Sequence, residues 1–367
     1  MPMKTIVCLG LALAAAVAHA EEPPVFHRYA ITPLVGGTGF EAYINSSGAI
    51  AATQRSPDRA FVWTSPGQRR FLDIPIAGKP AVSGINDAGT VVGQVEYQID
   101  PSSLSAGAYI ANANGTYVNI GAAFPSYSLA HYVNNSGTAV GEFGTVAGPE
   151  KAFIYNNGTL TTVGAENSWD GIGFHAINDS GSIAGSQRGN RTGVFTAFTY
   201  HDGQFTYLPG LGGTVNSVHD IDSAGTVVGG SNFSGDAYGH AVMWRDGEAI
   251  DLTPGFAYST TAFGLNDLGQ VVGTGSGPGW IWTDGRVAQL NQLIDPASGW
   301  SIDSAFDINN AGQIVAHGCK AMLTECGVLL LDPLGLVPDP PPVPEPSTVL
   351  LLLAGLSVLF AGRLHHR

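Results

Sequence analysis

The stretch that decides the fold reads Ile85-Asn86-Asp87-Ala88-Gly89-Thr90-Val91-Val92-Gly93. An Asn or Asp side chain at the start of a turn bonds the backbone two residues on, and glycine adopts the positive φ that such turns need. The β-branched residues that follow favour an extended strand. These nine residues therefore predict a tight turn that delivers the chain into a β-strand.

The same kind of turn occurs seven times along the chain, this one included. Its Asn or Asp stands at residues 45, 86, 134, 178, 222, 266 and 309, so consecutive turns are 41, 48, 44, 44, 44 and 43 residues apart. The turns are Ile44–Gly48, Ile85–Gly89, Val133–Gly137, Ile177–Gly181, Ile221–Gly225, Leu265–Gly269 and Ile308–Gly312. A period in the low forties is typical of one four-stranded blade of a β-propeller.

Each repeat also contains the remaining strands of a blade. A variable loop leads to an aromatic strand such as Ala152-Phe153-Ile154-Tyr155, and a second turn such as Asn157-Gly158 reverses the chain in a hairpin. A final strand such as Gln204–Leu208 follows. The pattern therefore predicts four strands in each repeat.

The seventh repeat lacks its final strand, because no hairpin follows Gly327–Pro333. The N-terminal segment Tyr29–Thr38 resembles Phe205–Thr214, which includes the final strand of the fourth repeat. An N-terminal strand that completes the last blade closes the ring and removes two exposed sheet edges. The sequence therefore predicts an all-β fold, a seven-bladed β-propeller over residues 21–336. Six or eight blades stay open as alternatives if one repeat is degenerate.

The composition agrees with many short strands and excludes one class of partner. With 50 glycines, 22 prolines and only 12% charged residues, long helices are disfavoured, while 44% hydrophobic residues are too many for a disordered chain. The formal net charge is −14, with 15 lysines and arginines in total. Because phosphate binding depends on those two residue types, we expect no nucleic-acid partner.

The start of the aromatic strand carries a family resemblance. His240-Ala241-Val242, Arg59-Ala60-Phe61 and Lys151-Ala152-Phe153 are variants of a His-Ala-Phe triplet, and residues 28–333 resemble the HAF family of extracellular repeats. The resemblance implies a secreted repeat protein and carries no activity with it.

The N-terminus has the features of a secretory signal peptide. A basic start at Lys4, an apolar run from Ile6 to Val17 and the small-residue site Ala18-His19-Ala20 occur in order. The apolar run is too short to span a bilayer comfortably. We therefore expect residues 1–20 to be removed by signal peptidase during export.

The C-terminus consists of three segments in a characteristic order. A proline-rich linker, residues 337–347, contains Pro344-Glu345-Pro346, and a hydrophobic segment (348–362) and a basic tail (363–367) follow it. This order resembles the PEP-CTERM sorting signal of Gram-negative bacteria. We expect the segment to be a helix that holds the chain in the inner membrane before processing, with the basic tail inside. The resemblance implies processing by an exosortase, a place outside the cell or at its surface, and a link to exopolysaccharide or biofilm production. A plain membrane anchor is the alternative.

Two cysteines, Cys319 and Cys326, remain once the signal peptide is removed. An even pair in an oxidising compartment predicts a disulfide. Two thiols alone do not predict zinc, which takes about four ligands.

Three histidines occupy equivalent positions in consecutive repeats. His131, His175 and His219 each lie three residues before the Asn or Asp of their turn, and imidazoles at one height on adjacent blades can bind a metal. Strand alternation, however, places each histidine on the same face as the apolar residue two positions later. We expect that face to pack against the neighbouring blade, and so we predict no metal site.

Carboxylates offer a second candidate site. Asp220 and Asp307 lie two residues before the Asn or Asp of their turns, and Glu41 lies four before Asn45. A propeller mouth can assemble the carboxylate pair of a glycoside hydrolase from distant blades, but nothing distinguishes these residues from ordinary loop acids. The chain has no G-x-S-x-G, P-loop or H-E-x-x-H motif, and we predict no catalytic residue and no cofactor.

The sequence leads to two main hypotheses about function. The first is a non-catalytic exported protein whose variable loops, such as Val95–Ala106 and Ser186–Val194, bind a polysaccharide or an envelope protein. The second is a glycan hydrolase or lyase with acidic residues at the channel mouth. Converging carboxylates would favour the enzyme, whereas an aromatic or plugged channel would favour binding. A purely structural role in the matrix is a third possibility.

Overall fold

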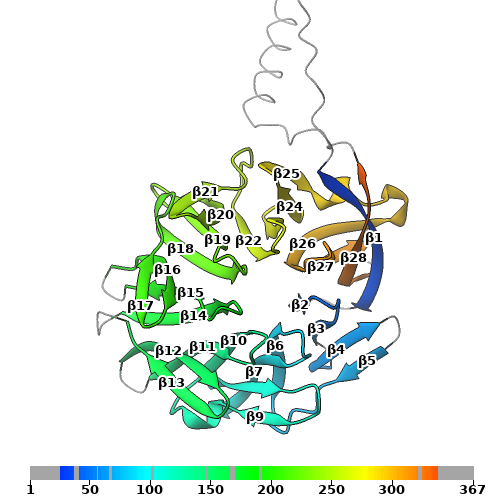
Figure 1. Cartoon of the computed structure of the whole chain (residues 1–367). Coiled ribbons are helices and arrows are strands. Elements are labelled where there is room, and N and C mark those ends of the chain that lie inside the picture. The colour runs from blue at the N-terminus through cyan, green and yellow to red at the C-terminus, as the bar shows by residue number, and fades with distance from the viewer. Residues whose placement is uncertain are drawn as a thin grey trace, which may run out of the picture.

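The computed structural model describes residues 25–36, 41–55, 57–65, 68–100, 103–145, 148–165, 170–189, 192–320 and 325–337. These residues form 28 strands and three short 3-10 helices, η1 (Gly121–Ala123), η2 (Leu290–Gln292) and η3 (Pro296–Ser298). The strands make seven four-stranded blades around a central axis, so the all-β propeller that the sequence predicts is confirmed (Figure 1). None of the helices in these ranges has the length and apolar character needed to cross a bilayer.

Six blades take four consecutive strands each, and the first strand of a blade lies next to the axis and is called its inner strand (Figure 1). Blades 1 to 3 comprise β2 (Ala42–Ile44), β3 (Ile50–Gln54), β4 (Arg59–Ser65) and β5 (Gln68–Phe71); β6 (Lys79–Ile85), β7 (Val91–Asp100), β8 (Ser103–Ala111) and β9 (Tyr117–Asn119); and β10 (Ser128–Val133), β11 (Ala139–Thr145), β12 (Gly148–Asn156) and β13 (Thr159–Val163).

Blades 4 to 6 comprise β14 (Gly171–Ile177), β15 (Ile183–Arg188), β16 (Phe195–His201) and β17 (Gln204–Tyr207); β18 (Gly212–Ile221), β19 (Val227–Phe233), β20 (Gly239–Arg245) and β21 (Glu248–Asp251); and β22 (Thr260–Leu265), β23 (Val271–Gly275), β24 (Trp280–Thr283) and β25 (Arg286–Gln289). A single parallel pair, Phe195 with Val215, links blades 4 and 5 into one eight-stranded sheet.

Blade 7 closes the ring by joining the two ends of the described chain. It consists of β26 (Trp300–Ile308), β27 (Ile314–Lys320), β28 (Cys326–Val337) and, at its outer edge, β1 (Phe26–Gly36). β1 pairs with β28 in antiparallel register, from Phe26 opposite Val337 to Gly36 opposite Gly327. The N-terminal strand therefore completes the last blade, as its sequence predicts, and β28 ends one residue beyond the predicted propeller boundary.

β28 also fixes where the chain leaves the ring. It starts at Cys326 opposite Cys319, at the end of β27 that is remote from the turn Ile308–Gly312, and it passes Leu331 opposite Ile314 at the turn. Val337 thus lies at the end of the ring that carries the seven Asn/Asp-Gly turns, which we call the turn end. The predicted signal peptide, the linker from residue 338 onward with Pro344, Glu345 and Pro346, and the segments after it lie outside the described residues.

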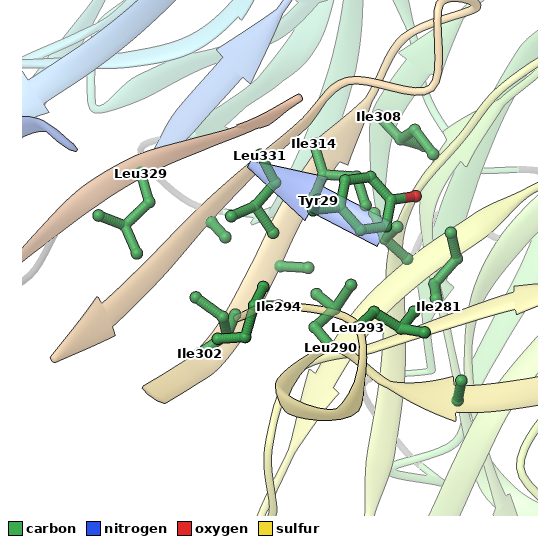
Figure 2. Close-up of a cluster of buried hydrophobic side chains, with 14 of the residues drawn as sticks. Tyr29, Ile281, Leu290, Leu293, Ile294, Ile302, Ile308, Ile314, Leu329 and Leu331 are labelled. Carbon is green, nitrogen blue, oxygen red and sulfur yellow. The ribbon is translucent and has the colours of Figure 1, made fainter. Parts of the chain in front are cut away.

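Tyr29 of β1 is buried at the joint between blades 6 and 7. Figure 2 shows it beside Ile314 and Leu331 of blade 7, with Leu290 and Leu293 of the segment after β25 on its other side. Its main-chain N–H donates to the Leu293 carbonyl over 2.9 Å. β1 therefore completes blade 7 and also joins it to blade 6.

The hydrophobic core is divided among the joints between blades. Seven buried clusters are found in the described ranges, and each one joins the facing sheets of two adjacent blades. At the closing joint, Phe61 and Trp63 of blade 1 pack with Val328 and Leu330 of blade 7. The closing joint therefore has a buried apolar cluster of its own, as the other six joints do.

The turn asparagines join neighbouring blades as well as shaping their own turns. Each side-chain Oδ1 accepts the N–H four residues on, as Asn134 does from Thr138 over 2.9 Å. Each Nδ2 donates to a main-chain carbonyl of the next blade over 2.9–3.0 Å, in the pairs Asn45–Asn86, Asn86–Asn134, Asn134–Asn178, Asn178–Asp222, Asn266–Asn309 and Asn309–Asn45. The joint between blades 5 and 6 lacks this bond, because Asp222 has no amide to donate.

Candidate functional site

A β-bulge in the inner strands turns two consecutive side chains toward the axis. In β10, Ala130 lies opposite Gly141 and Tyr132 opposite Val140, so His131 is an extra residue with no partner on β11. The same shift occurs before the turn in the inner strands of blades 2, 4, 5, 6 and 7. His131 and Tyr132 both line a central cavity as a result.

The bulge overturns the placement that strand alternation predicts for the three histidines. We expected His131, His175 and His219 to face a neighbouring blade together with the apolar residue two positions later. That expectation was wrong, because the extra residue breaks the alternation between the histidine and its turn. All three histidines line the cavity instead.

The cavity has a volume of about 760 Å³, which lies within the usual range for ligand pockets. The residue three positions before the Asn or Asp of the turn lines the cavity in every blade. Around the ring these residues are Ala42, Ser83, His131, His175, His219, Phe263 and Phe306. The wall is thus imidazole-rich on blades 3 to 5, aromatic on blades 6 and 7, and formed by small side chains on blades 1 and 2.

The cavity extends to the end of the ring at which the inner strands begin, which we call the mouth. Tyr127, Glu150, Arg188 and Phe195 line it there. The guanidinium of Arg188 lies over the Phe195 ring, 5.8 Å from its centroid, and the Glu150 carboxylate lies beside Tyr127. A cation, a carboxylate and two aromatic rings therefore frame the mouth beside blades 3 and 4.

Tyr43, Tyr132, Asp220 and Asp307 form the floor of the cavity. Tyr132, Asp220 and Asp307 also line a second cavity of about 180 Å³ among the turns. The Tyr132 side chain lies beside Asp220. Because the same three residues bound both spaces, they divide the axis into a wide cup and a small chamber at the turn end.

Asp220 and Asp307 also accept hydrogen bonds from neighbouring blades. The Ile221 and Leu265 N–H groups donate to the two oxygens of Asp220 over 2.8 and 3.1 Å. Asp307 accepts from Ile308 and, across the closing joint, from Ile44, over 2.8 and 2.9 Å. Asp220 thus bridges the joint at which Asp222 lacks an amide.

Burial makes these two aspartates poor anions. It raises the pKa of Asp307 to about 7. Burial, together with the neighbouring charge of Asp307, raises the pKa of Asp220 well above its ordinary value. The sequence-predicted acid pair therefore lies at the floor of one cavity, where burial disfavours the ionised form of both carboxyl groups.

A second polar group lies on the wall between blades 3 and 4. His131 Nε2 is 3.9 Å from Oε1 of Glu142, and the His131 and His175 rings are 5.1 Å apart at an interplanar angle of 54°. The Glu142 carboxylate lies directly over Gly173, where the Cβ of any other residue would collide with it. The absence of a side chain at residue 173 therefore allows Glu142 to reach between the two histidines.

The charges of this group are set by burial and by one another. Burial lowers the pKa of His175 to about 3 and that of His219 to about 4, with His131 lowering both further, so both rings are neutral near pH 7. Burial alone would raise the pKa of Glu142, but His131 and His175 hold it below its usual value. An ionised carboxylate thus lies among imidazoles.

Sequence reasoning missed Glu142, although a signal for it exists. It follows the Val-Gly pair of its repeat, at a position that carries Thr53, Gln94, Ser186, Gly230, Thr274 and His317 elsewhere. Glu142 is the one acid at that repeat position.

The predicted cysteine pair, Cys319 and Cys326, forms a disulfide between β27 and β28. Asp303, His317 and Cys319 bring potential metal-ligand atoms within 4.8 Å of one another. The Cys319 sulfur is bonded to Cys326, however, and His317 Nδ1 is hydrogen-bonded to Asp303 Oδ1 over 2.8 Å, so these groups are already engaged with partners of their own.

Comparison with known proteins identifies the C-terminal segment. Residues 342–367 match the PEP-CTERM protein-sorting motif, which includes Pro344, Glu345 and Pro346. The chain is therefore an exosortase-sorted β-propeller, and the motif implies export and sorting to the cell surface. No curated protein is similar enough in sequence to count as a match.

Solved structures share the fold at low sequence identity. The β-propeller domain of the Trilobed protease from Pyrococcus furiosus, described as having an open velcro topology, has a TM-score of 0.52 and 10% identity, over 85% of this chain and all of that one. Virginiamycin B lyase from Staphylococcus aureus has a TM-score of 0.51 and 11% identity, over 83% and 100%. YCF48 bound to D1 peptide has a TM-score of 0.51 and 12% identity, over 87% and 99%.

Proposed function

We propose that this sorted propeller is a non-catalytic binding protein whose central cup holds the end of a polysaccharide chain from the cell envelope or extracellular matrix. The observation that carries the proposal is the cup itself. It is open at the mouth, closed by the floor of Tyr132, Asp220 and Asp307, and lined by imidazoles on one side and phenylalanines on the other.

A sugar ring matches such a wall because it is amphipathic. Its C–H face packs on aromatic rings, which Phe263 and Phe306 present, while its hydroxyl groups need donors and acceptors. His131, His175 and Glu142 supply those from the facing wall. The resemblance to the HAF family of extracellular repeats and the sorting motif both agree with a ligand that lies outside the cell.

The bonding of the floor acids favours binding over hydrolysis. A hydrolase needs one carboxylate that stays ionised and a partner that donates a proton. Asp220 and Asp307 each accept two main-chain N–H groups, and the pKa of each is raised. Both carboxyl groups are thus engaged in hydrogen bonds between blades, and burial raises the pKa of both rather than separating the two values.

The test incubates the full chain, purified in mild detergent, with the exopolysaccharide of its host. We expect retention of the protein without release of reducing ends or unsaturated sugars. Phe263→Ala should weaken retention about tenfold by removing an aromatic contact at the centre of the site. The matched control is Phe71→Ala on the outer strand β5, whose ring is 39% exposed and lies outside the cup. Equal retention by the Phe263 and Phe71 variants would overturn the proposal.

One observation favours the alternative of a glycan hydrolase or lyase. Glu41, Glu142 and Glu150 line the same cup, so carboxylates that are not committed to blade joints converge there. The enzyme hypothesis requires product release that disappears in Glu150→Gln or Glu142→Gln. Release lost in Asp220→Asn or Asp307→Asn, with the fold intact, would assign the catalytic role to the floor. Neither retention nor release would direct the search to a protein partner.

A further inference from the structure

Two carboxylates of blade 3 lie in a row along the inner strand of blade 4. The Glu142 carboxylate lies over Gly173 and the Glu150 carboxylate over Gly171, where a Cβ on either glycine would collide with it. Residues two apart on a strand point to the same face and are roughly 6.5–7 Å apart. The two carboxylates therefore follow one face of β14 in the cup, with Glu150 at the mouth and Glu142 deeper.

Glu142 is not paired with its nearest imidazole. Its Oε1 is 3.9 Å from Nε2 of His131, beyond hydrogen-bonding distance, and that nitrogen has no hydrogen-bond partner in the part of the chain that the structure describes. The Glu142 side chain is 22% exposed, so its carboxylate has lost much of its water. Such a group gains most from a donor that also carries a positive charge.

Acidic side chains outnumber basic ones on the wall of the cup. Above the floor, the lining carboxylates are Glu41, Glu142 and Glu150. Among the described residues that line the cup, Arg188 at the mouth is the one lysine or arginine. His175 and His219 add no positive charge near pH 7, because burial lowers the pKa of both. With a formal net charge of −14 on the whole chain, the cup attracts a cationic ligand and repels an anionic one.

The aromatic wall suits the same kind of ligand. Phe263 and Phe306 line the cup from blades 6 and 7, whereas Glu142 and Glu150 belong to blade 3. The face of an aromatic ring packs on the C–H face of a sugar, and its negative electrostatic potential also attracts cations. An amino sugar combines an apolar face with a positive charge, and so it matches both walls.

We propose that the glycan held by the cup carries free amino groups, and that Glu142 and Glu150 determine this specificity by pairing with the protonated amines of amino sugars. The inference rests on the proposed glycan binding and names the class of sugar. A polymer that enters by its end meets Glu150 first and Glu142 next. An N-acetylated sugar has no charge to offer these carboxylates, and a uronic acid is repelled by them.

The experiment compares two oligosaccharides of the same length and linkage, a tetramer of glucosamine and a tetramer of N-acetylglucosamine. Their binding to the full chain in mild detergent is measured by isothermal titration calorimetry at about pH 6, where an ordinary amino group is protonated. We expect the glucosamine tetramer to bind at least about tenfold more tightly. Glu142→Gln and Glu150→Gln keep the size of the side chain but remove its charge, so each should lower this ratio of affinities severalfold.

Three controls separate the two carboxylates from the general charge of the protein. Gly173→Ala keeps both carboxylates but places a Cβ where that of Glu142 lies, so the ratio should fall as well. Glu248→Gln makes the same chemical change on the exposed strand β21, outside the cup, and should leave the ratio unchanged. A tetralysine peptide carries amines without a sugar and should bind much more weakly than the glucosamine tetramer. Far-UV circular dichroism verifies the fold of each variant.

Equal affinity for the two oligosaccharides would overturn the inference and leave glycan binding itself in place. Failure of the glucosamine tetramer to bind would overturn it too, while exopolysaccharide retention tests glycan binding separately. A preference that survives in the double variant Glu142→Gln with Glu150→Gln would show that other groups select the amine. Tetralysine that binds as tightly as the sugar would show that the cup selects a cationic peptide, which also contradicts the inference.

Discussion

At the residue scale, the turn asparagine does two things that aspartate can do only in part. Its Oδ1 shapes the turn and its Nδ2 bonds the next blade, as in Asn178, which donates to the Asp222 carbonyl. Asp222 keeps the first contact, through Thr226 N–H, and lacks the second. The ring of inter-blade bonds therefore has one gap that a single amide can fill.

We predict that Asp222→Asn raises the free energy of unfolding by about 1 kcal/mol, because the new amide can donate to the Asn266 carbonyl. The reverse change, Asn134→Asp, removes a buried donor and should lower it by about 1–3 kcal/mol. Urea denaturation measures both. Asp202→Asn makes the same chemical change in an exposed hairpin turn and should shift stability by less than about 0.5 kcal/mol. A destabilised Asp222→Asn would contradict this account of the gap.

The floor acids make stability depend on pH in a defined direction. The pKa of Asp307 is about 7 in the folded chain and about 3.9 when unfolded, so between these values the folded state holds a proton that the unfolded state has lost. Stability from this group therefore falls as pH rises from about 4 to 7. His175 and His219, with lowered pKa values, act in the opposite sense over pH 4–6.5.

The test is therefore a difference between proteins. We predict that the stability advantage of the wild type over Asp307→Asn, measured by urea denaturation, is largest near pH 4 and shrinks as pH rises to 7. At every pH the variant also lacks an acceptor for one of two N–H groups, Ile44 or Ile308, so this loss adds a constant to the difference. An advantage that grows with pH would show that Asp307 is ionised in the folded protein.

At the element scale, β1 carries a side chain whose hydroxyl gains nothing from burial. Tyr29 is 3% exposed, and its hydroxyl has no hydrogen-bond partner among the residues that the structure describes. Burial also raises the pKa of the Tyr29 phenol above its ordinary value. The ring itself fills the blade 6–blade 7 joint (Figure 2).

We predict that Tyr29→Phe is neutral or slightly stabilising, whereas Tyr29→Ala lowers the free energy of unfolding by about 3–5 kcal/mol through the cavity that it leaves. Thermal and urea denaturation of the two variants measure the difference. A loss of more than about 1 kcal/mol in Tyr29→Phe would reveal a partner for the hydroxyl.

The inner strands show what the sequence could and could not predict. The turns, the period and the closing strand follow from local chemistry, because Asn and Gly shape a turn wherever they occur and a missing strand leaves an edge to be filled. The orientation of the histidines does not follow from local chemistry, because a one-residue bulge reverses the face of every side chain beyond it. Small residues beside the bulge, Gly84, Ala176 and Gly264, are its trace in the sequence. The place of Glu142 in the site could not be predicted from its own repeat, because Glu142 of blade 3 lies near His175 of blade 4 only once the ring has formed.

At the scale of the whole molecule, closure by β1 makes the blades depend on one another. Each joint has its own apolar cluster and most have an asparagine bond, so no blade is complete without its neighbours. We predict a single unfolding transition at which tryptophan fluorescence and far-UV circular dichroism coincide.

Deletion of residues 25–36 exposes the edge of β28 and empties the joint around Tyr29. It should lower the free energy of unfolding by on the order of 5 kcal/mol and promote association through the free edge. A deletion variant with an unchanged transition midpoint would show that the ring holds without its closing strand.

The direction of β28 decides how the protein is presented on a cell. The chain passes Val337 at the turn end, on the opposite side of the ring from the mouth of the cup, and the sorting segment follows from there. We therefore expect a protein held by that segment to present the mouth of its cup away from the point of attachment.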